Sequence, residues 1–124
     1  MSPIQKEILK CMSDLKAAGE SLQARFSFPK EFVGFQGHFK DNPVLPGICK
    51  IQAVLAMYES FYNKPFRLSE VSLAKYFLPV TFDETVTVQC DLKSPEGLFS
   101  IKAALHRDEA KVAMLQLVLE GAES

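Results

Sequence analysis

Residues 37–48 read Gly-His-Phe-Lys-Asp-Asn-Pro-Val-Leu-Pro-Gly-Ile and lead directly into a helical pattern that extends to Tyr62. Glycines and prolines restrict the backbone of this loop, and Pro46 and Gly47 stand where the helix should begin. The first N–H groups of a helix have no partner within it, and the helix dipole is positive there. This helix end can therefore receive a partly negative oxygen, such as that of a polarised carbonyl.

The helix predicted over residues 47–62 carries apolar side chains around a wide arc, so we expect it to be largely buried. These side chains are Ile48, Ile51, Val54, Leu55, Tyr58, Phe61 and Tyr62. The chain that follows has strand-like patterns in four stretches separated by turn-forming residues. They cover residues 68–77, 85–92, 98–105 and 111–119.

The chain before the loop contains one predicted helix and one predicted strand. A capping-box pattern that begins at Ser2, followed by apolar residues at helical spacing, predicts a helix over residues 1–20 that Gly19 ends. Residues 22–28 alternate between apolar and polar side chains, which predicts a strand ended by Pro29.

Together these patterns predict an α+β fold in which an antiparallel sheet curls around one buried central helix over residues 47–62, with an extra N-terminal helix over residues 1–20. The length fits a single domain over residues 1–124, because no linker-like stretch divides the chain. Hydrophobic residues make up 48% of the chain, which is enough to form a core.

The charge balance excludes several classes of protein. Lys and Arg number 14 against 15 Asp and Glu, so no excess of positive charge favours nucleic acid or an acidic lipid surface. No apolar run reaches the roughly 20 residues of a membrane span, and no signal pattern opens the chain, so we expect a cytoplasmic protein. The three cysteines, Cys11, Cys49 and Cys90, lack the spacing of a metal site, and we expect ordinary packed thiols and no metal.

The pattern Gly-His-Phe-x-x-x-Pro-Val-Leu-Pro-Gly of residues 37–47, running into an apolar helix, resembles the signature of the 3-hydroxyacyl-acyl-carrier-protein dehydratases of fatty-acid synthesis. The similarity is close over residues 37–53 and weaker over residues 74–80. It implies a hotdog fold and a homodimer whose two tunnels each hold an acyl chain on a phosphopantetheine arm. The partner would be acyl carrier protein, with coenzyme A as the other possible carrier, and no cofactor would be needed.

The resemblance also implies a role for each matching residue. His38 would remove a proton from the carbon next to the thioester carbonyl, and the Gly47 N–H would hold the thioester oxygen as negative charge develops on it. The neighbouring residues would contact the substrate: Phe39, Val44, Leu45, Pro46 and Ile48. In the family, an acidic residue on the central helix, contributed by the other subunit, protonates the departing hydroxyl group.

Gln52 stands fourteen residues after His38, where that acid belongs. A carboxamide can donate a hydrogen bond but has no proton to transfer, whereas a general acid contributes about a hundredfold to ten-thousandfold. Glu59 shares a helical face with Gln52 but lies roughly 10 Å further along the axis. Lys40 and Asp41 replace a Pro-Gly pair of the family, and Asp41 is a conceivable acid.

Several of these residues also have ordinary structural interpretations. Gln52 is equally well explained as a buried hydrogen-bonding group at the dimer interface. Cys49, near the start of the helix, is more easily explained as a packed thiol than as a reactive one. A series of phenylalanines favours a hydrophobic core over an acyl tunnel: Phe26, Phe28, Phe32, Phe35 and Phe39.

Three functions remain open from the sequence. The leading hypothesis is a dehydratase that uses His38, Gly47 and Gln52 across a homodimer. The second is a non-catalytic relative that binds acyl thioesters or partners an active subunit. The third is a hotdog thioesterase. It ranks last because it needs a carboxylate to activate water, and position 52 carries a glutamine instead.

Overall fold

The computed structural model describes residues 3–35, 43–93 and 98–121. Two α-helices, one short 3₁₀ helix and six strands follow one another along the chain. They are α1 (Pro3–Lys10), β1 (Met12–Ala18), β2 (Ser21–Ser27), η1 (Val33–Phe35), α2 (Gly47–Tyr62), β3 (Phe66–Tyr76), β4 (Thr85–Lys93), β5 (Phe99–Arg107) and β6 (Ala110–Gly121).

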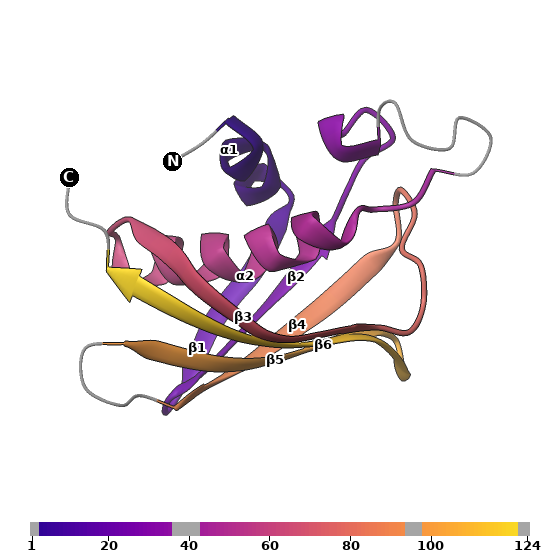
Figure 1. The fold of residues 1–124 in the computed structure, drawn as a ribbon. Helices are drawn as coiled ribbons and strands as arrows, with labels where there is room; N and C mark the ends of the chain where they lie inside the picture. The colour runs from indigo at the N-terminus through magenta and orange to yellow at the C-terminus, as the bar shows by residue number, and fades with distance from the viewer. Residues whose placement is uncertain (1–2, 36–42, 94–97, 122–124) are drawn as a thin grey trace.

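The six strands form one antiparallel sheet in the order β1-β2-β4-β5-β6-β3. This sheet curves around α2, and α1 packs against the other side of that helix (Figure 1). A curved antiparallel sheet around one long helix is the architecture of the hotdog fold, so the predicted fold class is confirmed. The bounds of α2 are those predicted from the sequence.

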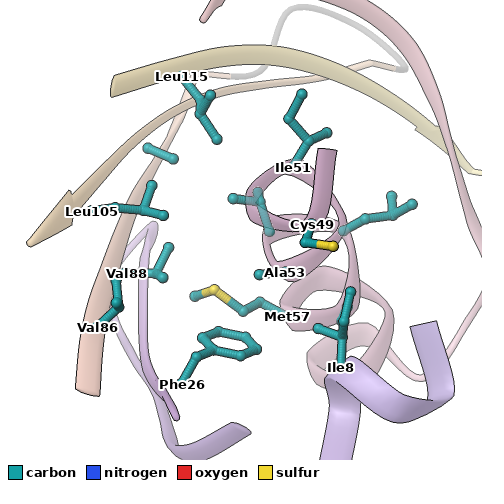
Figure 2. Packing of buried hydrophobic residues seen from close by; sticks show 14 of the residues in the cluster. Ile8, Phe26, Cys49, Ile51, Ala53, Met57, Val86, Val88, Leu105 and Leu115 are labelled. Carbon is teal, nitrogen blue, oxygen red and sulfur yellow. The ribbon is translucent and has the colours of Figure 1, made fainter. Parts of the chain in front are cut away.

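The core lies between α2 and the concave face of the sheet. Figure 2 shows Met57 of α2 beside Phe26 and Val88 of the sheet, while Ile8 of α1 approaches the helix from another side. Because α2 is enclosed by the sheet and by α1, it is largely buried, as predicted, although Ile48, Phe61 and Tyr62 of the predicted apolar arc are exposed. The phenylalanines of the series that are described, Phe26, Phe28, Phe32 and Phe35, are all buried, which confirms the core interpretation for these four.

The N-terminal helix is shorter than predicted. It ends at Lys10, and Met12–Ala18 form β1, which pairs with β2 in an antiparallel hairpin. The helix prediction over residues 1–20 is therefore wrong from Met12 onward. The glycine at position 19 has a φ of +62°, a conformation that suits a hairpin turn as well as the end of a helix. Hydrogen bonding to the edge of β2 makes these residues a strand rather than a continuation of the helix.

Strand β3 forms an edge of the sheet and pairs with β6 alone among the described strands. Large apolar side chains stand exposed on and just after it: Val71, Tyr76 and Phe77. Its first residue is tied to the helix, because the Phe66 N–H donates a hydrogen bond to Glu59 Oε2 at 2.9 Å. The far end of α2 is thus fixed to this edge strand through one carboxylate oxygen of Glu59.

Candidate functional site

The start of α2 is open to a ligand. Pro46 precedes the helix in an extended conformation, with φ −60° and ψ 147°, and makes no side-chain capping hydrogen bond. Its carbonyl accepts a hydrogen bond from the Cys49 N–H at 3.0 Å, which closes the first turn. The N–H groups of Gly47 and Ile48 precede this first hydrogen bond, so they have no partner within the helix. They can therefore donate to an oxygen placed at the positive end of the helix.

A groove of about 450 Å³ lies against this helix end. One wall comes from the loop and the first turn of α2, and the other from the end of β3 and the segment after it. The lining residues are Val44, Leu45, Pro46, Gly47, Lys50, Tyr76, Phe77, Leu78 and Pro79. The volume and mainly apolar lining are those of a site for a small organic ligand.

Backbone hydrogen bonds hold the two walls in place. The Leu45 N–H donates to the Val80 carbonyl at 2.7 Å, which ties the loop directly to the segment after β3. That segment is fixed in turn by the Phe77 N–H, which donates to the carbonyl of Val112 at 2.8 Å. Arg107 Nη1 donates to the Pro79 carbonyl, also at 2.8 Å. The groove is therefore formed before any ligand arrives.

Tyr76 covers the first residue of the helix. A Cβ atom added at Gly47 would lie 2.8 Å from both Cζ and the hydroxyl oxygen of the Tyr76 ring, closer than real Cβ contacts occur. Glycine at this position therefore lets the ring pack where it does against the helix start, and a larger residue would shift it. The same packing keeps the Gly47 amide at the wall of the groove, and partial burial raises the pKa of the Tyr76 hydroxyl.

We expect Gly47→Ala to shift the Tyr76 ring and to destabilise the protein by only about 0.5–1 kcal/mol, because the new methyl group meets the far end of a half-exposed side chain. Thermal or urea unfolding measures this change. In a Tyr76→Ala background the same substitution should be neutral or slightly stabilising, since alanine is a better helix former than glycine. An equal cost in both backgrounds would contradict this account of the packing.

Lys50 is the charged residue of the groove. Its side chain is 4% exposed, and its Nζ donates to the Leu45 carbonyl at 3.4 Å and lies 5.1 Å from the centre of the Tyr76 ring. No carboxylate of the described residues forms an ion pair with it. Burial lowers the pKa of Lys50 below that of an ordinary lysine. Within the described part of the chain, the ammonium group has one weak hydrogen bond and one aromatic ring as partners, so its charge is poorly compensated there.

Lys50 also borders a small internal cavity of about 10 Å³. The remaining walls of this cavity are apolar side chains from the sheet, the loop and α2: Phe26, Phe28, Leu45, Ala53, Val80, Val86, Val88 and Leu105. A volume of this size is at the lower limit for a single water molecule. This cavity is therefore too small for an acyl chain.

Gln52 is partly buried on α2, and its Oε1 is buried with no hydrogen-bond partner among the described residues. A buried amide oxygen without a partner is uncommon in folded proteins, so a donor from a ligand or from another subunit would complete it. Glu59, weighed as a substitute acid, lies at the opposite end of the helix and is bonded to Phe66. It is remote from the groove.

The structure brings part of the predicted site together. Val44, Leu45, Pro46 and Gly47 line one groove. Ile48, by contrast, is 54% exposed and does not line it, because the helix turns its side chain away. The predictions for His38, Phe39 and Asp41 fall outside the described residues.

Sequence reasoning missed Lys50 and Tyr76. The signal available for Lys50 was a lysine inside the otherwise apolar first turns of a buried helix, where a charge is unexpected. Tyr76 lay in the segment of residues 74–80 that resembles the family, but nothing in the pattern paired it with Gly47.

The cysteines behave as packed thiols. Burial is the main cause that raises the pKa of Cys11, Cys49 and Cys90, so the thiolate form is disfavoured at all three positions. Across residues 3–35, 43–93 and 98–121, no three His, Cys, Asp or Glu side chains gather as a metal site would require. The helices in these ranges are too short or too polar to cross a membrane.

The fold and the groove define a hotdog protein with an open helix end as its candidate site. The family model for ApeI-like proteins, described as ApeI dehydratase, matches residues 14–114, which is most of the chain. The chain belongs to the ApeI-like dehydratase family. This bears out the dehydratase class that the loop motif indicated, while the family identified is the ApeI-like one. No curated protein sequence matches the chain.

Solved structures share the fold at low sequence identity. The ApeI:P dehydratase heterocomplex of Xenorhabdus doucetiae has a TM-score of 0.72 and 17% identity, covering 88% of this chain and 96% of that one. A homologue of HP0420 from Helicobacter felis has a TM-score of 0.68 and 12% identity, with coverages of 94% and 99%. Cj0977, a sigma28-regulated virulence protein of Campylobacter jejuni, has a TM-score of 0.68 and 11% identity, with coverages of 98% and 89%.

Proposed function

We propose that the protein is a hydro-lyase that removes water from 3-hydroxyacyl thioesters carried on acyl carrier protein. The observation that carries the proposal is the uncapped start of α2, which opens onto a groove of suitable size. A thioester carbonyl placed there would receive a hydrogen bond from the Gly47 N–H. Membership of a dehydratase family supports the reaction class.

In this proposal His38 removes a proton from the carbon next to the carbonyl, and the Gly47 N–H holds the oxygen on which negative charge develops. The 3-hydroxyl group donates a hydrogen bond to Gln52 Oε1, the buried oxygen that lacks a partner among the described residues, and this bond would hold the hydroxyl group in position to leave. The proton taken by His38 leaves with the hydroxyl group as water. Because the elimination uses only acid–base groups, we propose that it needs no cofactor.

We propose a homodimer, since the exposed apolar side chains of β3 and the unpaired edge of that strand would be covered by a second subunit. Sedimentation at micromolar concentration should give a mass near twice 13.9 kDa. A monomer alone would remove the basis of a shared site. The Xenorhabdus relative is part of a dehydratase heterocomplex, so a protein that dimerises only with a different hotdog subunit would favour the partner hypothesis instead.

The decisive experiment incubates the purified protein with 3-hydroxybutyryl and crotonyl thioesters of pantetheine and of acyl carrier protein. We expect interconversion of the two acyl groups without release of free thiol. Thiol release would instead indicate a thioesterase. Binding without either reaction would favour the non-catalytic hypothesis, which the glutamine at position 52 supports because it carries no transferable proton.

A further inference from the structure

We propose that Lys50 is a second oxyanion-stabilising residue, whose ammonium group and the Gly47 N–H together hold the thioester oxygen in the groove. This inference rests on the proposed function and adds a charged group to it. Lys50 and Gly47 line the same groove, one turn apart on α2. Both residues therefore border the space that a thioester bound at the helix start would occupy.

The surroundings of Lys50 favour an anion as the missing partner. The ammonium sits within the first turn of a helix, where the dipole already places positive charge, and burial removes most of its water. Among the residues that the structure describes, its contacts are the Leu45 carbonyl and the Tyr76 ring, which leave N–H donors unused. The titratable neighbours among the described residues are Cys49 and Tyr76, whose pKa values are both raised, so neither supplies a negative charge.

The chemical step balances with Lys50 unchanged. His38 takes the α-proton, and the electrons of the broken C–H bond move toward the carbonyl, so the thioester oxygen becomes an enolate oxygen between Lys50 and Gly47. When the enolate collapses, the C–O bond to the 3-hydroxyl group breaks, and that group takes the proton from His38 and leaves as water. Lys50 remains an ammonium throughout, and a trans-enoyl thioester is formed.

Exchange of the α-proton isolates the step in which Lys50 acts. Butyryl-pantetheine has no hydroxyl group to expel, so incorporation of deuterium at its α-carbon in D₂O, followed by NMR, reports enolate formation alone. We expect Lys50→Met to slow this exchange about a hundredfold, within the range seen when one oxyanion donor is removed. Dehydration of the 3-hydroxybutyryl thioester should fall by a similar factor.

Lys64→Met is the matched control, because Lys64 is an exposed lysine that also lies over aromatic rings, those of Phe66 and Phe99. It should leave both rates unchanged. Thermal melting checks that each variant folds, and Lys50→Gln replaces Lys50→Met if the methionine variant does not. As a second readout, the thioester C=O stretch of bound crotonyl-pantetheine should shift less from its solution value in the variant than in the wild type.

The outcomes are distinguishable. A folded Lys50 variant that exchanges deuterium at the wild-type rate overturns the role of Lys50 and leaves the proposed dehydration standing. Loss of dehydration with unchanged exchange also overturns it, because the defect then lies at hydroxyl departure. A wild-type protein that neither exchanges nor dehydrates overturns the proposed function and this inference with it.

Discussion

Replacing His38 with alanine is expected to abolish dehydration of 3-hydroxyacyl thioesters. Under the proposed mechanism this imidazole is the only base that removes the α-proton and the only carrier that returns it to the hydroxyl group. General bases contribute about a hundredfold to ten-thousandfold, so the rate should fall by at least the lower of these factors. Hydration of crotonyl-pantetheine, followed by the loss of enoyl absorbance, measures the effect.

His106→Ala is the control for His38→Ala, because the chain has two histidines and His106 lies in β5, away from the groove. This control should retain wild-type activity. Both variants should melt near the wild-type temperature. If His38→Ala unfolds, the histidine has a structural role; if it folds and keeps full activity, the assignment of the base is wrong.

Replacing Gln52 with glutamate is expected to raise dehydratase activity tenfold or more. The substitution keeps nearly the same shape and places a titratable proton where the family carries its acid. The amide oxygen of Gln52 is buried, so a carboxyl group there should have a raised pKa and stay partly protonated near neutral pH, as a general acid requires. Steady-state kinetics with the 3-hydroxybutyryl thioester measures the gain.

Gln89→Glu, an exposed position on β4, controls for the added negative charge and should not change the rate. Because burial of a carboxyl group costs stability, each variant must first be shown to fold and dimerise. A folded Gln52→Glu variant that stays at wild-type activity would direct attention to Asp41 as the acid. Inactivity of both proteins, with binding of acyl-pantetheine retained, would favour the non-catalytic hypothesis.

The fold was largely predictable because its strongest signals are local. The bounds of α2 followed from the Pro-Gly start and an apolar arc that ends at Tyr62, and the later strands followed from their alternation. β1 was missed because Met12 and Leu15 continue the helical spacing of the residues before them, and Gly19, which follows the strand, fits either structure. Only the hydrogen bonds to β2, which no local pattern encodes, decide that it is a strand.

Residues of the site were predictable where they belong to one continuous segment. They were not predictable where the site forms between two segments that are distant in the sequence. Val44 to Gly47 are adjacent in the sequence, so their common location followed from the motif. The contact of Tyr76 with Gly47 joins residues that are far apart along the chain and depends on the curvature of the sheet. The burial of Lys50 also depends on packing between segments: the sequence shows a lysine in an apolar helix, but not that the rest of the fold encloses its side chain.

The small size of the cavity behind the groove has a consequence for selectivity. At about 10 Å³, the cavity that Lys50 borders is too small for a hydrocarbon tail. If the protein acts on acyl thioesters as proposed, we expect the tail to run along the surface where two subunits meet. The surface that limits the length of the acyl chain would then be formed by both subunits. Exchanging one subunit for a different hotdog protein would change which acyl chains are accepted.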